Sequence, residues 1–102
     1  MGQQFLDQYS LLHASSGVAA YFWGIPLWKW SIAHVVFEFL ENTEGGMKII
    51  NENIPFWPGG KPKADRLINI VGDNLSAILG WLTASAIDKR GKNQKWYDAR
   101  IN

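Results

Sequence analysis

The sequence predicts an all-α integral membrane protein, a single domain over residues 1–102 built as a bundle of about three helices. Two long stretches are almost free of fixed charge: between residues 10 and 37 only Lys29 is charged, and between residues 67 and 87 only Asp73 is. A helix needs about 20 mostly apolar residues to cross a bilayer. The chain also holds 6 Trp, 3 Tyr and 5 Phe, and Trp and Tyr concentrate at membrane–water boundaries.

The rest of the composition narrows the possible functions. The formal net charge is +1, from 10 basic and 9 acidic residues. So small a charge creates no field that attracts nucleic acid, and we expect no nucleic-acid partner. The chain has no Cys, which excludes a disulfide framework, a thiolate metal site and a cysteine nucleophile.

The first predicted helix covers residues 5–25. It is mostly apolar, with a small and polar face that includes His13, Ser16 and Gly17. Small residues let another helix backbone approach closely, so we expect Gly17 at a helix contact. The helix ends at Gly-Ile-Pro, residues 24–26, because proline disfavours helix at the preceding residue and suits the first turn of a new one.

The second predicted helix covers residues 26–42. Trp28, Lys29 and Trp30 near its start form a cationic and aromatic cluster suited to a headgroup boundary, and we expect them to be interface anchors. This segment is marginal in length for a full span. The alternative is a helical hairpin that enters one leaflet and returns.

Residues 43–63 are rich in Gly and Pro and are predicted to form a loop, with a short interfacial helix around residues 47–51. Trp57 before the Pro-Gly-Gly turn is expected to be a further interface anchor. Lys61 and Lys63 would either reach lipid phosphates or remain solvated in a basic turn.

The third predicted helix covers residues 64–88. Gly72, Ser76 and Gly80 form a ladder of small residues at helical spacing, which predicts close packing against another helix. Asp73 lies inside this ladder. A carboxylate at mid-span costs roughly 2.5–3.5 kcal/mol even on the lenient insertion scale, so Asp73 must face protein or water and needs a partner.

The second segment offers such partners, because His34 and Glu38 are four residues apart and share one helix face. Each of the three segments thus has one face of polar or small residues. We expect the helices to pack with these faces inward, because polar groups in a membrane face the interior of a bundle. The predicted polar seam consists of His13, His34, Glu38, Glu41, Asn42, Asp65, Asn69 and Asp73.

The residues of the polar seam are compatible with catalysis or with metal binding. His34, Glu38 and Asp73 are the candidate catalytic residues. His34 and Glu38 supply half of a metal site, which Asp73 and His13 would complete, but no metal motif such as H-E-x-x-H is present. We therefore expect no metal and no cofactor.

Three spans predict a multi-pass topology. The loop and the basic tail then lie on opposite sides, and the tail's side also holds Lys29. The positive-inside rule favours a cytoplasmic C-terminus.

Four motifs carry a family resemblance: H-x-x-F-E-x-x-E-N from His34, F-W-P-G-G-K from Phe56, D-x-x-x-N-x-x-G-D from Asp65, and Gly80-Trp81. In this order they resemble small uncharacterised membrane proteins of large DNA viruses of algae and protists. More loosely, the second half is similar to VanZ-like bacterial membrane proteins. The positions that match the VanZ-like pattern are Glu38, Asp73, Asn74 and Gly80. Both resemblances imply a polytopic membrane protein and no established reaction.

The leading hypothesis is a structural or accessory membrane protein that contacts the lipid bilayer and other membrane or capsid proteins in a viral or virus-modified membrane. The seam would then fix helix packing. The first alternative is a membrane enzyme or proton-coupled carrier that uses Glu38 and Asp73 with His34 as relay. The second is a soluble helical domain with an aromatic core.

Overall fold

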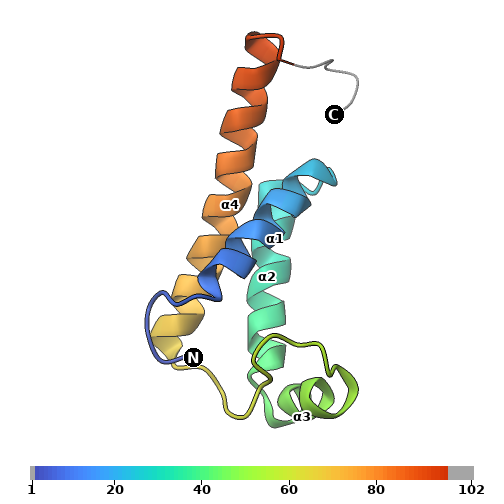
Figure 1. The fold of residues 1–102 in the computed structure, drawn as a ribbon, viewed down its shortest axis with the longest axis vertical. Coiled ribbons are helices and arrows are strands. Elements are labelled where there is room, and N and C mark those ends of the chain that lie inside the picture. Colours follow the sequence, from blue (N-terminus) through green and yellow to red (C-terminus); the bar gives the residue numbers. More distant parts are fainter. Residues whose placement is uncertain (1, 97–102) are drawn as a thin grey trace.

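The computed structural model describes residues 2–96, which form four helices and, within that range, no strand. They are α1 (Ser10–Phe22), α2 (Leu27–Glu41), α3 (Glu44–Asn53) and α4 (Leu67–Asn93). Figure 1 shows α4 running the length of the molecule, with α1 laid across it, α2 beside α1 and α3 at the end where α2 stops. The molecule is elongated, 47 × 26 × 22 Å.

The first helix is shorter than the predicted span of residues 5–25, because a local turn precedes it. Asp7 accepts a hydrogen bond from the Tyr9 amide at 2.9 Å, and its own amide donates to the Ser10 hydroxyl at 3.0 Å. Asp and Ser favour such side-chain-to-backbone bonds over a continuing helix. At the other end Gly24 adopts a φ of +81°, a conformation that glycine takes at no steric cost.

α3 is longer than the short helix expected at residues 47–51. The Thr43 hydroxyl caps it by accepting a hydrogen bond from the Gly46 amide at 3.0 Å. α4 begins and ends later than the predicted 64–88. Arg90 and Lys92 lie in its last turn, where cations favour the negative end of the helix dipole.

α1 packs mainly on α4, and glycines make the close approach possible. A Cβ added at Gly17 would overlap the Ala77 carbonyl, and one at Gly80 would overlap the Ala14 carbonyl. The Trp81 indole also donates to the Ile25 carbonyl at 2.8 Å, which ties the α1–α2 turn to α4. These contacts hold the polar faces of α1 and α4 against each other.

The distribution of burial is inverted relative to a water-soluble domain. Within residues 2–96 the buried apolar side chains are only Ala20, Ile50, Ala77 and Ala84, whereas 24 large hydrophobic side chains are exposed. The buried polar and charged residues are His34, Glu38, Glu41, Lys61, Asn69, Asp73, Ser76, Ser85 and Asp88. Soluble proteins rarely expose such extensive apolar surface without a partner to cover it.

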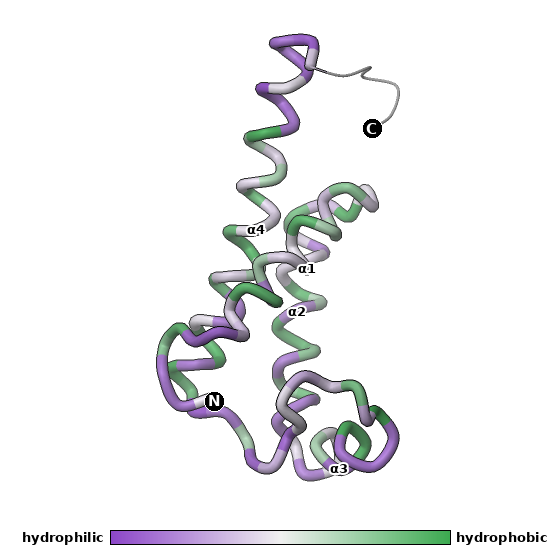
Figure 2. The backbone as a smooth tube through the Cα atoms, viewed as in Figure 1, coloured by the Kyte–Doolittle hydropathy of each residue, from purple (hydrophilic) through white to green (hydrophobic). Residues whose placement is uncertain are grey.

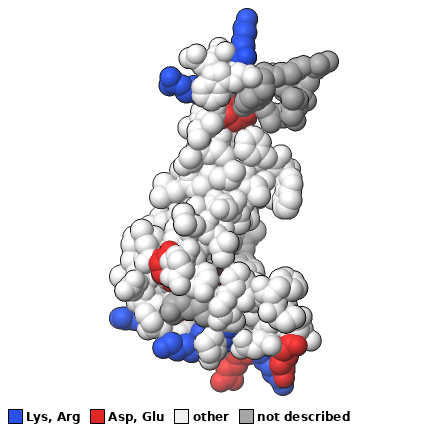
Figure 3. Space-filling view, viewed as in Figure 1, with Lys and Arg blue, Asp and Glu red and all other residues white. Residues whose placement is uncertain are grey.

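Hydropathy and charge divide along the long axis. Figure 2 shows the apolar segments on α1, α2 and the middle of α4, with polar segments towards the two ends of α4. On the face shown in Figure 3, Lys and Arg gather at the two ends of the molecule and the middle carries none.

Among the described helices, α4 alone is long and apolar enough to cross a membrane, and 39% of its apolar window is buried by the rest of the chain. α1 has 13 residues and α2 has 15, and at about 1.5 Å per residue neither reaches across a hydrocarbon core of about 30 Å. The all-α prediction is confirmed. The multi-pass, three-helix membrane bundle is not, because two of its three helices are too short.

Candidate functional site

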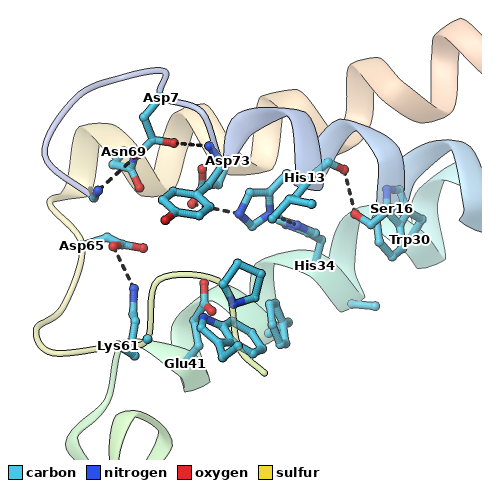
Figure 4. Close-up of a pocket in the computed structure, with 18 residues that line it drawn as sticks. Asp7, His13, Ser16, Trp30, His34, Glu41, Lys61, Asp65, Asn69 and Asp73 are labelled. Atoms are coloured by element: carbon cyan, nitrogen blue, oxygen red, sulfur yellow. Dashed lines mark hydrogen bonds and ion pairs between the residues drawn. The ribbon is translucent and has the colours of Figure 1, made fainter. Parts of the chain in front are cut away.

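A pair of histidines lies at the centre of the polar faces, one from α1 and one from α2. His13 Nδ1 is 2.9 Å from His34 Nε2, and the two rings meet edge to face. On the far side of His34, Nδ1 is 2.8 Å from the Asn74 amide oxygen. On the far side of His13, Nε2 is 3.3 Å from Asp73 Oδ2. The pair is therefore held at both ends by residues of α4. Figure 4 shows His13, His34 and Asp73.

Four carboxylates adjoin the histidine pair. Glu38, Glu41, Asp65 and Asp73 each place a carboxylate oxygen within 4.8 Å of the others, and Glu38 Oε1 is 3.5 Å from His13 Nδ1. Glu38 is fully buried and Asp73 is 3% exposed. Glu38 Oε1 and Asp73 Oδ1 have no hydrogen-bond partner. A buried carboxylate oxygen is costly unless a proton, a water, an ion or a ligand group satisfies it.

Lys61 is the cation that faces this cluster, and it corrects the expectation of a solvated or lipid-bound side chain. It is 5% exposed, and its ammonium lies 2.7 Å from Asp65 Oδ1. The Asn51 side chain holds the Lys61 backbone with two hydrogen bonds, at 2.6 and 2.8 Å. α3 thus positions the loop that carries Lys61, whereas Lys63 is exposed.

A pocket of about 490 Å³ opens beside the cluster. One part of its wall is polar and includes His13, His34, Asp73 and Lys61, which Figure 4 shows facing the same space. The other part is apolar and aromatic, from Leu12, Trp30, Ala33, Phe37, Trp57 and Pro58. This volume falls within the range of about 300–1,000 Å³ that is usual for small-molecule sites.

The structure brings all eight predicted seam residues into one neighbourhood. Six of them are the histidines and carboxylates described above. Asn42 donates to the Glu38 carbonyl and accepts from the Asp65 amide, both at 2.8 Å. Asn69 donates to the Gln4 carbonyl at 2.7 Å and lines the pocket. The helix-packing candidates also lie at backbone contacts: besides Gly17 and Gly80, Gly72 abuts the Phe5 carbonyl, and Ser76 is buried.

Two of the four predicted interface anchors are placed differently. Trp28 and Lys29 are exposed, as an anchor requires. The Trp30 indole instead donates to the Ala77 carbonyl at 3.1 Å, and Trp57 packs on Phe37 with ring centroids 5.9 Å apart. Both line the pocket, because the helix face and the loop that carry them turn towards the histidine pair.

Lys61 and Asp7 belong to the site but were not predicted to. Asp7 lines the pocket and accepts from the Asn69 amide at 3.3 Å. Nothing in the local pattern of residues 2–9 or of the loop indicated that the half-buried Asp7 or the buried Lys61 lies at a pocket. Asp88 is a second buried carboxylate and does not line this pocket. It accepts a hydrogen bond from the Tyr21 hydroxyl, and the Lys92 ammonium lies 3.2 Å from Asp88 Oδ2.

Comparison with known proteins adds no relative: no family model, no curated protein and no solved structure matches the chain. The function is therefore inferred from the geometry of the site.

Proposed function

We propose that this chain is a small integral membrane protein that binds an amphiphilic, lipid-like molecule and acts on its polar end by acid–base chemistry. The membrane part of the proposal follows from the inverted surface. The exposed hydrophobic side chains of α1, α2 and α4 are covered in a bilayer, while the buried polar groups stay away from lipid tails. α4 spans the bilayer and the α1–α2 hairpin is embedded against it.

One observation carries the choice of function: the histidine pair and Asp73, whose Oδ1 has no hydrogen-bond partner, line a pocket whose remaining wall is apolar and aromatic. The unpartnered Glu38 Oε1 does not line the pocket but lies 3.5 Å from His13 Nδ1. A purely structural polar network is most stable when every member is satisfied. This one leaves the Asp73 acceptor available beside an open space. Imidazole and carboxylate groups within hydrogen-bond reach of a ligand are the usual means of proton transfer.

The division of the pocket wall into an apolar part and a polar part favours an amphiphilic ligand. A hydrocarbon or aromatic portion would pack on Trp30, Phe37 and Trp57, and a polar group would reach His13 and Asp73. A molecule dissolved in the bilayer reaches such a site without leaving the membrane.

Membrane fractionation tests the first part. We expect the protein to remain in the pellet after alkaline carbonate treatment and to enter solution only with detergent. Recovery of folded protein in buffer without detergent would support the soluble helical domain instead.

Binding tests the second part. The probe is a fluorescent single-chain phospholipid, titrated into the purified protein in detergent. Ala33→Phe fills the pocket and is expected to weaken binding at least tenfold. Ala86→Phe is the matched control, since Ala86 lies on an exposed face of α4 outside the pocket. Equal binding by both variants would show that the pocket does not hold the lipid.

The structural or accessory role, with other membrane or capsid proteins as partners, is the second candidate. It is favoured by the close backbone approach of α1 and α4 at Gly17 and Gly80. Asp73→Asn separates the two. Under the acid–base proposal, the variant remains helical and inserted in the membrane but no longer acts on the polar end of the bound molecule. Loss of folded protein would instead support a polar seam that serves helix packing alone.

A further inference from the structure

The Asn74 side chain determines which nitrogen of His34 carries hydrogen. The Asn74 amide nitrogen donates to the Ile70 carbonyl at 3.0 Å, so its oxygen is the atom that faces His34. An amide oxygen only accepts. His34 Nδ1, at 2.8 Å from it, is therefore the donor, and Nε2 of the neutral ring presents a lone pair.

Asp73 determines which nitrogen of His13 carries hydrogen. His13 Nε2 lies 3.3 Å from Asp73 Oδ2. When Asp73 is ionised, its carboxylate oxygens only accept hydrogen bonds. Nε2 then carries the hydrogen, and Nδ1 of the neutral ring presents a lone pair towards His34.

The ligand atoms of His13, His34 and Glu38 all lie within 4.8 Å of one another, and with Asp73 ionised all three are acceptors. His13 Nδ1 and His34 Nε2 are 2.9 Å apart, and Glu38 Oε1 is 3.5 Å from His13 Nδ1 with no hydrogen-bond partner. Lone pairs at these distances repel one another unless a cation lies between them. Four buried or half-buried carboxylates lie beside Lys61, which pairs with Asp65, and they reinforce that need for positive charge.

We infer that His13, His34 and Glu38 bind a divalent transition-metal ion, with Zn²⁺ as the representative. Two imidazole nitrogens and one carboxylate oxygen are a ligand set that zinc uses. Asn74 and Asp73 fill the outer positions, where acceptors commonly fix the orientation of metal-bound histidines. Metal–nitrogen bonds of about 2.0–2.1 Å at tetrahedral angles require a nitrogen–nitrogen distance of about 3.3 Å, so the rings need to separate by only a few tenths of an ångström.

This inference deepens the proposed function and rests on the same site. Zinc sites with three protein ligands keep a position open for water. His13 and His34 both line the pocket, so that position is reached from the space proposed for the amphiphile's polar group. Such an ion would supply a water of lowered pKa next to the ligand.

Metal binding by the full chain in detergent tests the inference without requiring any activity. The chelator-stripped protein is titrated with Co²⁺ alone, followed by its visible absorption, and with Zn²⁺ alone, followed by metal content after dialysis. We expect one equivalent of either ion. His13→Gln, His34→Gln and Glu38→Gln should each lose at least 100-fold in affinity, and Asn74→Ala about 10–100-fold. Glu52→Gln, an exposed acid on α3, is the control and should bind as the parent does.

A measurement on the unaltered chain covers the case in which these variants fail to fold. The sequence has only 2 His, so nitrogen-15 histidine spectra report each ring directly. Zinc should shift His13 Nδ1 and His34 Nε2 and leave hydrogen on the outer nitrogens. A folded protein that binds no metal, or whose spectra show a proton shared between the rings at saturating Zn²⁺, overturns the inference. Metal binding without phospholipid binding would remove the proposed function and leave the metal site standing.

Discussion

At the residue scale, buried charge is the feature that most constrains this protein. Lys61 and Asp65 form an ion pair in which the side chains are 6% and 10% exposed, beside three further carboxylates. Removing one member of a buried pair leaves an uncompensated charge, which is far more costly than removing both.

Lys61→Met should therefore destabilise the fold by roughly 3–5 kcal/mol, the usual cost of breaking a buried pair. The measurement is the free energy of unfolding in mixed micelles, followed by far-ultraviolet circular dichroism. Lys63→Met removes an exposed charge from the same loop and should change stability little. The double variant Lys61→Met/Asp65→Asn should recover part of the loss; no recovery would mean that Lys61 contributes through packing rather than charge.

At the element scale, glycine has opposite roles in two helices. On α4, Gly80 lies where a Cβ would overlap the Ala14 carbonyl of α1. On α3, a Cβ at Gly45 would meet open space. The first glycine is required by a close helix contact, and the second only weakens its helix.

Gly80→Ala and Gly45→Ala should consequently shift stability in opposite directions. Forcing a methyl group into the α1–α4 contact should cost about 1–3 kcal/mol. Adding one to the exposed position in α3 should stabilise by about 0.5–1 kcal/mol, because alanine favours helix over glycine. The same unfolding measurement compares the two. No loss of stability in Gly80→Ala would show that α1 and α4 do not meet at Gly80, and a loss in Gly45→Ala would show that the methyl group at position 45 does not meet open space.

At the scale of the whole molecule, the helix lengths predict the topology. α4 is long enough to span the bilayer, whereas the α1–α2 hairpin, tied to α4 by the Trp81–Ile25 hydrogen bond, reaches only part of the way. The turn between α1 and α2 holds Trp23, which is 81% exposed. An aromatic ring so exposed is covered if the turn lies within the bilayer.

Labelling of single introduced cysteines tests this arrangement, because the chain has no native Cys that would react as well. Cysteines at Lys63 and Lys95 should react with a membrane-impermeant maleimide from opposite sides of sealed vesicles. A cysteine at Trp23 should be protected from both sides until detergent is added. Rapid labelling at position 23 from the side of Lys95 would instead indicate that α1 and α2 cross fully.

The sequence by itself determined the helical class, the break at Gly-Ile-Pro and the polar face of each helix, because these depend on local periodicity and on proline and glycine. It also indicated that His34, Glu38 and Asp73 share one environment, since isolated polar groups in apolar helices need partners. Only the tertiary structure decided that Lys61 is buried, that Trp30 and Trp57 face a pocket, and that Asn74 and Asp73 orient the two imidazoles. Those contacts join residues from separate elements, and their geometry depends on how α1 crosses α4 and on the path of the loop after α3, which no local pattern specifies.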